Sequence, residues 1–179
     1  AFVLDLSDGS LILAEKKYEV NGEKCFYFSE LFLECRAPLS QKSKLDIVTR
    51  AVDQVAKKYY GDEDAQKKME IKDIICNELE EQGEIKVSEL REKVFPGSPE
   101  MLEELDEKLD RYNLSYETVA PKNEQTIKKF QKQKLYTDTG IEITIPMEEY
   151  RNPDHVEFIT NMDGTISVLI KNIGMLSSK

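Results

Sequence analysis

The stretch from Lys122 to Tyr136 combines positive charge with aromatic rings, the residue types that hold a nucleic-acid strand. It contains five lysines and a single acidic residue, Glu124. Lysine ammonium groups neutralise phosphates, and aromatic rings stack on bases. If residues 128–136 are extended, alternate side chains share one face, namely those of Lys128, Phe130, Lys132, Lys134 and Tyr136. The candidate nucleic-acid-binding residues are therefore Lys122, Lys128, Lys129, Phe130, Lys132, Lys134 and Tyr136.

The same pattern has a second interpretation. Lysines on an edge strand discourage its pairing with another chain, so they can serve solubility alone. In that case Phe130 and Tyr136 pack inward after a β-bulge. Both interpretations stay open at the level of sequence.

Residues that could support catalysis are few or ordinary in their setting. A serine or cysteine triad needs a histidine, and the single one, His155, follows the common turn residues Pro153 and Asp154. A metal-dependent nuclease would need carboxylates that converge on Mg²⁺. The candidates are Glu142, Glu148, Glu149, Asp154 and Glu157. Because the chain has 35 acidic residues, such groupings arise by chance, and we predict a non-enzyme with no catalytic residues.

Signals for a cofactor or a metal ion are missing from the sequence. The eight glycines are isolated and form neither a dinucleotide-binding nor a P-loop motif. Cys25, Cys35 and Cys76 lie far apart in apolar surroundings, which is typical of buried thiols in a reducing, cytoplasmic compartment. We therefore predict no metal site, no cofactor and no small-molecule substrate.

Composition restricts the class of protein further. With 40% hydrophobic and 34% charged residues the chain is globular, and no stretch approaches the roughly 20 apolar residues of a membrane span. The net charge of −10 repels phosphates, so any binding of nucleic acid requires a local basic patch. The chain opens inside an apparent strand, residues 2–6, which predicts the C-terminal portion of a longer protein.

The order of elements predicts an α+β fold, in which antiparallel strands at both ends of the chain flank a central cluster of helices. Asn21-Gly22 predicts a hairpin between strands at residues 11–20 and 25–33. Apolar periodicity and capping residues predict helices at residues 40–60, 64–82, 88–95 and 98–112. Alternating residues predict strands at residues 141–145, 156–158 and 166–170. A possible subdivision is 1–61, 62–120 and 121–179.

The helical cluster could be drawn as a winged helix that reads DNA with its last helix, residues 98–112. Six acidic residues stand in that helix against Lys108 and Arg111. Such a helix is repelled by phosphates, so we reject a groove-reading role for it. It serves instead as a solubilising face or as a docking surface for a basic partner.

Several local patterns resemble one family of proteins. They are the opening strand at residues 2–6, the stretch 27–36 before a long helix, the segment 76–85, and the tail segments 140–145 and 163–171. Together they are similar to the C-terminal part of the NdpA (YejK) family of bacterial nucleoid-associated proteins. The resemblance implies a non-enzymatic, cytoplasmic protein located at the nucleoid and associated with DNA.

Two hypotheses of different classes follow. In the first, the chain contributes to sequence-tolerant DNA binding or to assembly of the full-length protein, and its partner is DNA. In the second, it is a protein-interaction or dimerisation module, a possible homodimer without direct DNA contact. A metal-dependent nuclease is the least favoured alternative.

Overall fold

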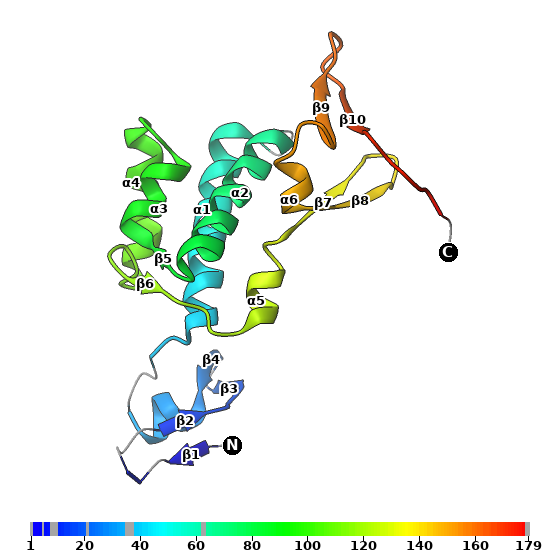
Figure 1. Ribbon diagram of the computed structural model, residues 1–179. Coiled ribbons are helices and arrows are strands. Elements are labelled where there is room, and N and C mark those ends of the chain that lie inside the picture. Colours follow the sequence, from blue (N-terminus) through cyan, green and yellow to red (C-terminus); the bar gives the residue numbers. More distant parts are fainter. Residues whose placement is uncertain are drawn as a thin grey trace. The chain divides into compact units, whose positions relative to one another are not determined.

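A computed structural model describes residues 2–4, 6–7, 11–20, 22–34, 38–61 and 64–177. The chain divides into two compact units, residues 1–40 and 41–179, whose elements are labelled in Figure 1. None of the helices formed by the described residues combines the length and apolarity that a membrane span requires. The subdivision at residues 61 and 120 stays a prediction.

The first unit consists of two small antiparallel strand pairs and one helical segment. Strand β1 (Phe2–Leu4) pairs with β2 (Leu11–Leu13), and β3 (Lys17–Val20) pairs with β4 (Glu23–Phe26). The predicted hairpin is confirmed, because Val20 pairs with Glu23 across a two-residue turn in which Gly22 has a φ of +85°; Asn21 lies outside the described residues. The strand predicted at residues 11–20 is divided into β2 and β3.

The strand predicted at residues 25–33 is wrong beyond Phe26, where a π-helix begins and covers Tyr27–Phe32. Side-chain carboxylates accept hydrogen bonds from backbone N–H groups that, in a strand, would bond to a neighbouring strand. Glu15 accepts from Phe28 and Ser29 at 3.2 Å each, and Glu30 accepts from Phe26 at 2.9 Å. Phe28 also stacks on Phe32 four residues later, a contact that a helical turn allows and a strand does not.

The second unit begins with the predicted helices. They are α1 (Gln41–Tyr60), α2 (Ala65–Gln82), α3 (Val87–Val94) and α4 (Pro99–Asp110), with the short antiparallel pair β5 (Ile85–Lys86) and β6 (Thr118–Val119). The Asp64 side chain caps α2 by accepting from the Lys67 N–H at 3.0 Å. Gly83 ends this helix with a φ of +70°, the left-handed conformation in which glycine is the usual residue.

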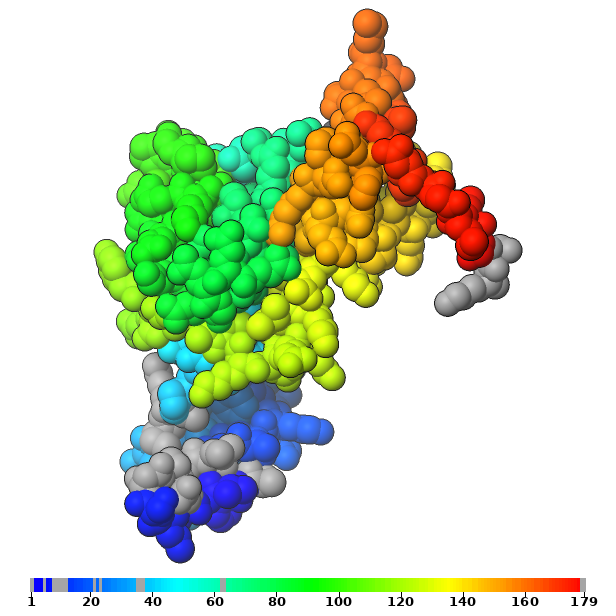
Figure 2. Space-filling model, viewed as in Figure 1, coloured from blue at the N-terminus to red at the C-terminus, as the bar shows by residue number. Residues whose placement is uncertain are grey.

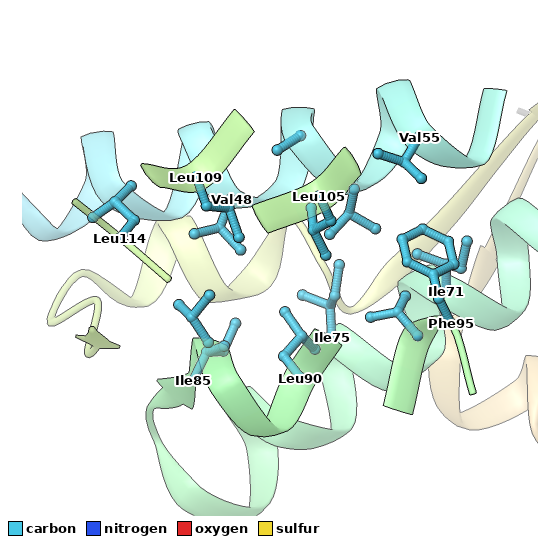
Figure 3. Close-up of a cluster of buried hydrophobic side chains, with 14 of the residues drawn as sticks. Val48, Val55, Ile71, Ile75, Ile85, Leu90, Phe95, Leu105, Leu109 and Leu114 are labelled. Carbon is cyan, nitrogen blue, oxygen red and sulfur yellow. The ribbon is translucent and has the colours of Figure 1, made fainter. Parts of the chain in front are cut away.

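The hydrophobic core of this unit lies among the four helices (Figure 3). The apolar stripe of α1 is formed by Leu45, Val48, Val52 and Val55, which are buried, whereas Tyr59 at the same helical spacing is 39% exposed. The stripe is joined by side chains from α2, α3 and α4 and from the adjoining segments, among them Ile71, Ile75, Ile85, Leu90, Phe95, Leu105, Leu109 and Leu114.

Two further strand pairs follow. Helix α5 (Glu124–Lys128) leads into β7 (Lys132–Tyr136), which pairs with β8 (Glu142–Pro146). Helix α6 (Met147–Tyr150) then leads into the hairpin of β9 (Val156–Thr160) and β10 (Ile166–Ile170). The α+β prediction, with antiparallel strands toward both ends of the chain and helices between them, is confirmed.

The cysteines are only partly as predicted. Cys76 of α2 is buried, but Cys25 of β4 is partly exposed, because the small strand pair that carries it has little apolar material to cover it. Cys35 lies outside the described residues.

Candidate nucleic-acid interface

Strand β7 presents a row of exposed side chains on its outer face. Lys132, Lys134 and Tyr136 are exposed, while Gln133 between them is buried and Leu135 is half-buried. Alternation along a strand is the cause, because successive side chains point to opposite faces. We call the row of Lys132, Lys134 and Tyr136 the β7 face.

The partner strand adds few acids to the β7 face. Lys132 stands opposite Pro146, Lys134 opposite Thr144, and Tyr136 opposite Glu142. Neither Lys132 nor Lys134 forms an ion pair with another residue that the structure describes. Two ammonium groups therefore stand together without counter-charges across the strand pair.

The prediction that Lys128 and Phe130 belong to the same extended face is wrong. The Asn123 side chain accepts from the Gln125 N–H at 2.8 Å and so starts helix α5, which ends at Lys128. Lys128 forms an ion pair with Glu124 at 3.4 Å. The ring of Phe130 is half-buried and packs against the helical core. The second interpretation expected inward packing of both Phe130 and Tyr136, and it is wrong for Tyr136, which is 66% exposed.

Lys122 and Lys129 are exposed and lie outside β7. Lys122 precedes α5 in a loop, and Lys129 follows the last residue of that helix. Figure 2 shows the surface of this part of the chain, from α5 to β8, in yellow-green and yellow. Of the seven residues predicted to bind nucleic acid, the structure brings Lys132, Lys134 and Tyr136 into one row and leaves the other four outside it.

Helix α2 supplies a lysine that the sequence did not single out. Lys72 donates from Nζ to the backbone oxygen of Lys132 at 2.5 Å, which places its ammonium group at the edge of β7. Burial lowers the pKa of Lys72, and the charge of Lys134 lowers it further, while Cys76 and Asp53 act against this shift. The ammonium groups of Lys72 and Lys134 are thus close enough to repel each other, although they are far apart in the sequence.

Asp53 of α1 lies near the same lysines. Burial raises its pKa, while the charges of Lys68 and Lys72 pull it down again. The i, i+4 spacing of Lys68 and Lys72 on α2 puts both on one side of the helix. This spacing is the one signal in the sequence that these two lysines lie close together. The contact with β7 joins segments that are far apart in the chain and carried no such signal.

Two buried or bridging side chains hold β7 and α6 against α2. Gln133 donates from Nε2 to the carbonyl oxygen of Met69 at 3.1 Å, in the buried layer under β7. Arg151, just after α6, bonds to Asp73 at 2.6 Å and to Glu80 at 2.9 Å. The guanidinium group holds the pKa of Glu80 below its ordinary value. These contacts fix the β7 face on the helical core.

Helix α4 remains unsuitable for binding phosphates. Its exposed acids include Glu100, Glu103 and Glu107. Its partly buried acids already have cationic partners, since Asp106 bonds to Arg91 at 2.5 Å and Glu104 bonds to Lys58 at 2.5 Å. The exposed charge of the helix is therefore negative.

Two of the residues considered for catalysis, His155 and Glu149, line a hollow of about 290 Å³ between β8, α6 and the β9–β10 pair. His155 Nδ1 contacts the Glu149 carboxylate, and Lys171 is paired with Glu157. Glu142 is exposed on β8, opposite Tyr136. Within the described ranges, no three metal-binding side chains are grouped so that they could hold an ion.

The structure is that of a mixed α+β protein in which strand β7 carries two exposed lysines. The chain belongs to the family described as nucleoid-associated protein YejK, whose family model matches residues 6–175. The match runs over nearly the whole chain, so the likeness is not limited to a C-terminal portion. The description names an association with the nucleoid and no catalytic activity. No curated protein and no solved structure matches the chain.

Proposed function

We propose that this chain is a non-enzymatic nucleoid-associated protein that contributes to sequence-tolerant DNA binding through the β7 face and Lys72. The proposal places it in the cytoplasm, at the nucleoid. Its support is the family membership, the exposed Lys132 and Lys134 of the β7 face, and Lys72, whose Nζ bonds to the backbone oxygen of Lys132 at the edge of the same strand.

The electrostatics of this group favour an anionic partner. Burial is the main cause that lowers the pKa of Lys72, and the charge of Lys134 adds a smaller contribution; a phosphate close to both ammonium groups would oppose this shift. The side chains of Lys132 and Lys134 are exposed, so they can reach phosphates without first being released from a buried site. Since lysines carry no fixed hydrogen-bond geometry, such contacts bind the backbone and do not select a base sequence.

Salt-titrated DNA binding tests this function. The logarithm of the binding constant should fall linearly with the logarithm of salt concentration. Replacing Lys132 and Lys134 with glutamine should make this line less steep, reducing the magnitude of its slope by about 1.4 to 1.8, because each phosphate contact contributes roughly 0.7 to 0.9. Replacing Lys42 and Lys86, two exposed lysines away from β7, is the charge-matched control. Binding that is absent, or that weakens equally in both variants, would refute the role of the β7 face.

A second candidate function, a dimerisation module, rests on exposed apolar side chains of the β9–β10 pair. Ile159, Ile166, Leu169 and Ile170 are exposed, and Ile170 retains 55% of its surface. Ile166 and Ile170 lie on one face of the strand pair, and Ile159 and Leu169 lie on the other, because successive side chains of a strand alternate. Exposed apolar surface is typical of interaction sites. Sedimentation equilibrium over a wide concentration range decides this function. A monomer at every concentration would refute it, and a dimer lost on replacing Leu169 and Ile170 with serine would support it.

A further inference from the structure

Tyr136 differs from the other aromatic side chain near β7 because its ring is not packed. It is 66% exposed, and it makes no ring contact or cation–π contact with another described residue. The ring of Phe130, by contrast, is half-buried against the helical core. An aromatic ring beside two lysines, with its surface open, is the platform on which a base can stack.

The spacing of the β7 face suits one strand of nucleic acid. Side chains two positions apart on a strand lie about 6.7 Å from each other, so Lys132, Lys134 and Tyr136 form a straight row that places two cations before one ring. A polymer that follows this row can set successive phosphates on the lysines and a base on Tyr136. The positive charge is confined to β7, because the residues opposite the lysines on the partner strand, Pro146 and Thr144, are uncharged.

A duplex gains less from the same row. Its bases are stacked on their neighbours, so their faces are closed to Tyr136 unless the helix is opened. Its higher charge density is also repelled more strongly by Glu142, which stands opposite Tyr136, and by a chain of net charge −10. A single strand can turn its phosphates away from Glu142 and still stack a base.

We propose that the β7 face binds single-stranded nucleic acid in preference to duplex, with Tyr136 as the stacking platform. This inference rests on the proposed function, because it assumes that the lysines of the β7 face hold phosphates. To the proposed function it adds the class of polymer, a single strand, and the residue that selects this class, Tyr136.

Fluorescence anisotropy with a labelled 15-nucleotide strand of mixed sequence, and with its duplex, tests the inference on the full chain. We expect the single strand to bind about tenfold more tightly than the duplex, a factor within the range of one stacked base. Tyr136→Ala should remove that preference by weakening single-strand binding about tenfold, the contribution of one stacked base, whereas Tyr136→Phe should retain it. Tyr116→Ala is the control, because Tyr116 is 86% exposed and lies outside β7.

The outcomes separate this inference from the proposed function. Equal affinity for both polymers, reduced by replacing Lys132 and Lys134, would overturn the single-strand preference and leave the proposed function intact. Binding of neither polymer would overturn both. An RNA strand of the same sequence forms a further arm, and tighter binding of either single strand than of the duplex supports the preference.

Discussion

Phe95 and Phe32 show how differently the two compact units place a large apolar side chain. Phe95, in the unit of residues 41–179, is 0% exposed, whereas Phe32, in the unit of residues 1–40, is 68% exposed. The contrast is general, because no apolar side chain described in residues 1–40 is buried. Burial of apolar surface is the main source of folding stability. The second unit therefore carries its own core, and the described part of the first unit has little core of its own.

The largest expected effect comes from emptying the core of the second unit. Phe95→Ala should lower the free energy of unfolding by about 3–5 kcal/mol, because it leaves a cavity among packed side chains. Phe32→Ala should lower it by less than about 1 kcal/mol, because an exposed ring loses little on truncation. Denaturant unfolding followed by circular dichroism measures both values. Equal losses of stability in the two variants would contradict the conclusion that the second unit has the larger core.

Thiol labelling gives the next effect, since each unit contains a described cysteine. Cys76 is 0% exposed, and burial raises the pKa of its thiol to about 11, while Cys25 is partly exposed. At pH 8 the thiolate fraction of Cys76 should be about 100-fold lower than that of a thiol with the ordinary pKa. Alkylation by iodoacetamide, read by peptide mass spectrometry, should therefore be far slower at Cys76 than at Cys25.

The same thiol makes stability depend on pH. Because its pKa is raised in the folded protein, its contribution to stability is present below the unfolded-state pKa near 9 and is lost as the pH rises toward 11.

The control for the alkylation experiment is labelling in denaturant, where Cys76 should react as fast as Cys25. Rapid labelling of Cys76 in the native protein would contradict its burial.

A smaller effect compares two glutamines within the second unit. Gln133→Ala should lower the free energy of unfolding by about 1–2 kcal/mol, because a buried hydrogen bond to the Met69 carbonyl is lost. Gln131→Ala should cost less than about 0.5 kcal/mol, since its bond to Glu80 is at an exposed site. Thermal unfolding of the two variants distinguishes them, and similar losses would mean that Gln133 does not anchor β7.

The smallest effect is expected for the exposed ion pair of α5. Glu124→Gln removes the partner of Lys128, and both side chains are largely exposed, so the free energy of unfolding should change by less than about 0.5 kcal/mol. The measurement is made at low and at high salt. A larger loss would show that α5 depends on this pair and would sharpen the distinction between surface and core.

Local patterns in the sequence predicted the helical part well. Apolar periodicity and capping residues predicted four helices in residues 40–112, and α1, α2, α3 and α4 begin and end within about two residues of the predicted bounds. These signals are local, because each depends on the conformation of a few neighbouring residues.

Sequence reasoning failed where long-range contacts or competing caps decide the structure. Asn123 caps a short helix, whereas the alternation of lysines and aromatic residues over 128–136 predicts an extended strand. The half-burial of Phe130 depends on the distant helical core. The contact of Lys72 with β7 depends on tertiary packing, which hydrophobic periodicity does not encode.

The bond between Gln133 and Met69 has a consequence for the charge of the surface. If β7 slipped by one residue relative to its neighbours, every side chain would change sides. Lys132 and Lys134 would then point at the helical layer, where an ammonium group is costly to bury, and Gln133 would face water. The side-chain amide of Gln133 thus helps to determine which face of the β7–β8 pair carries the positive charge.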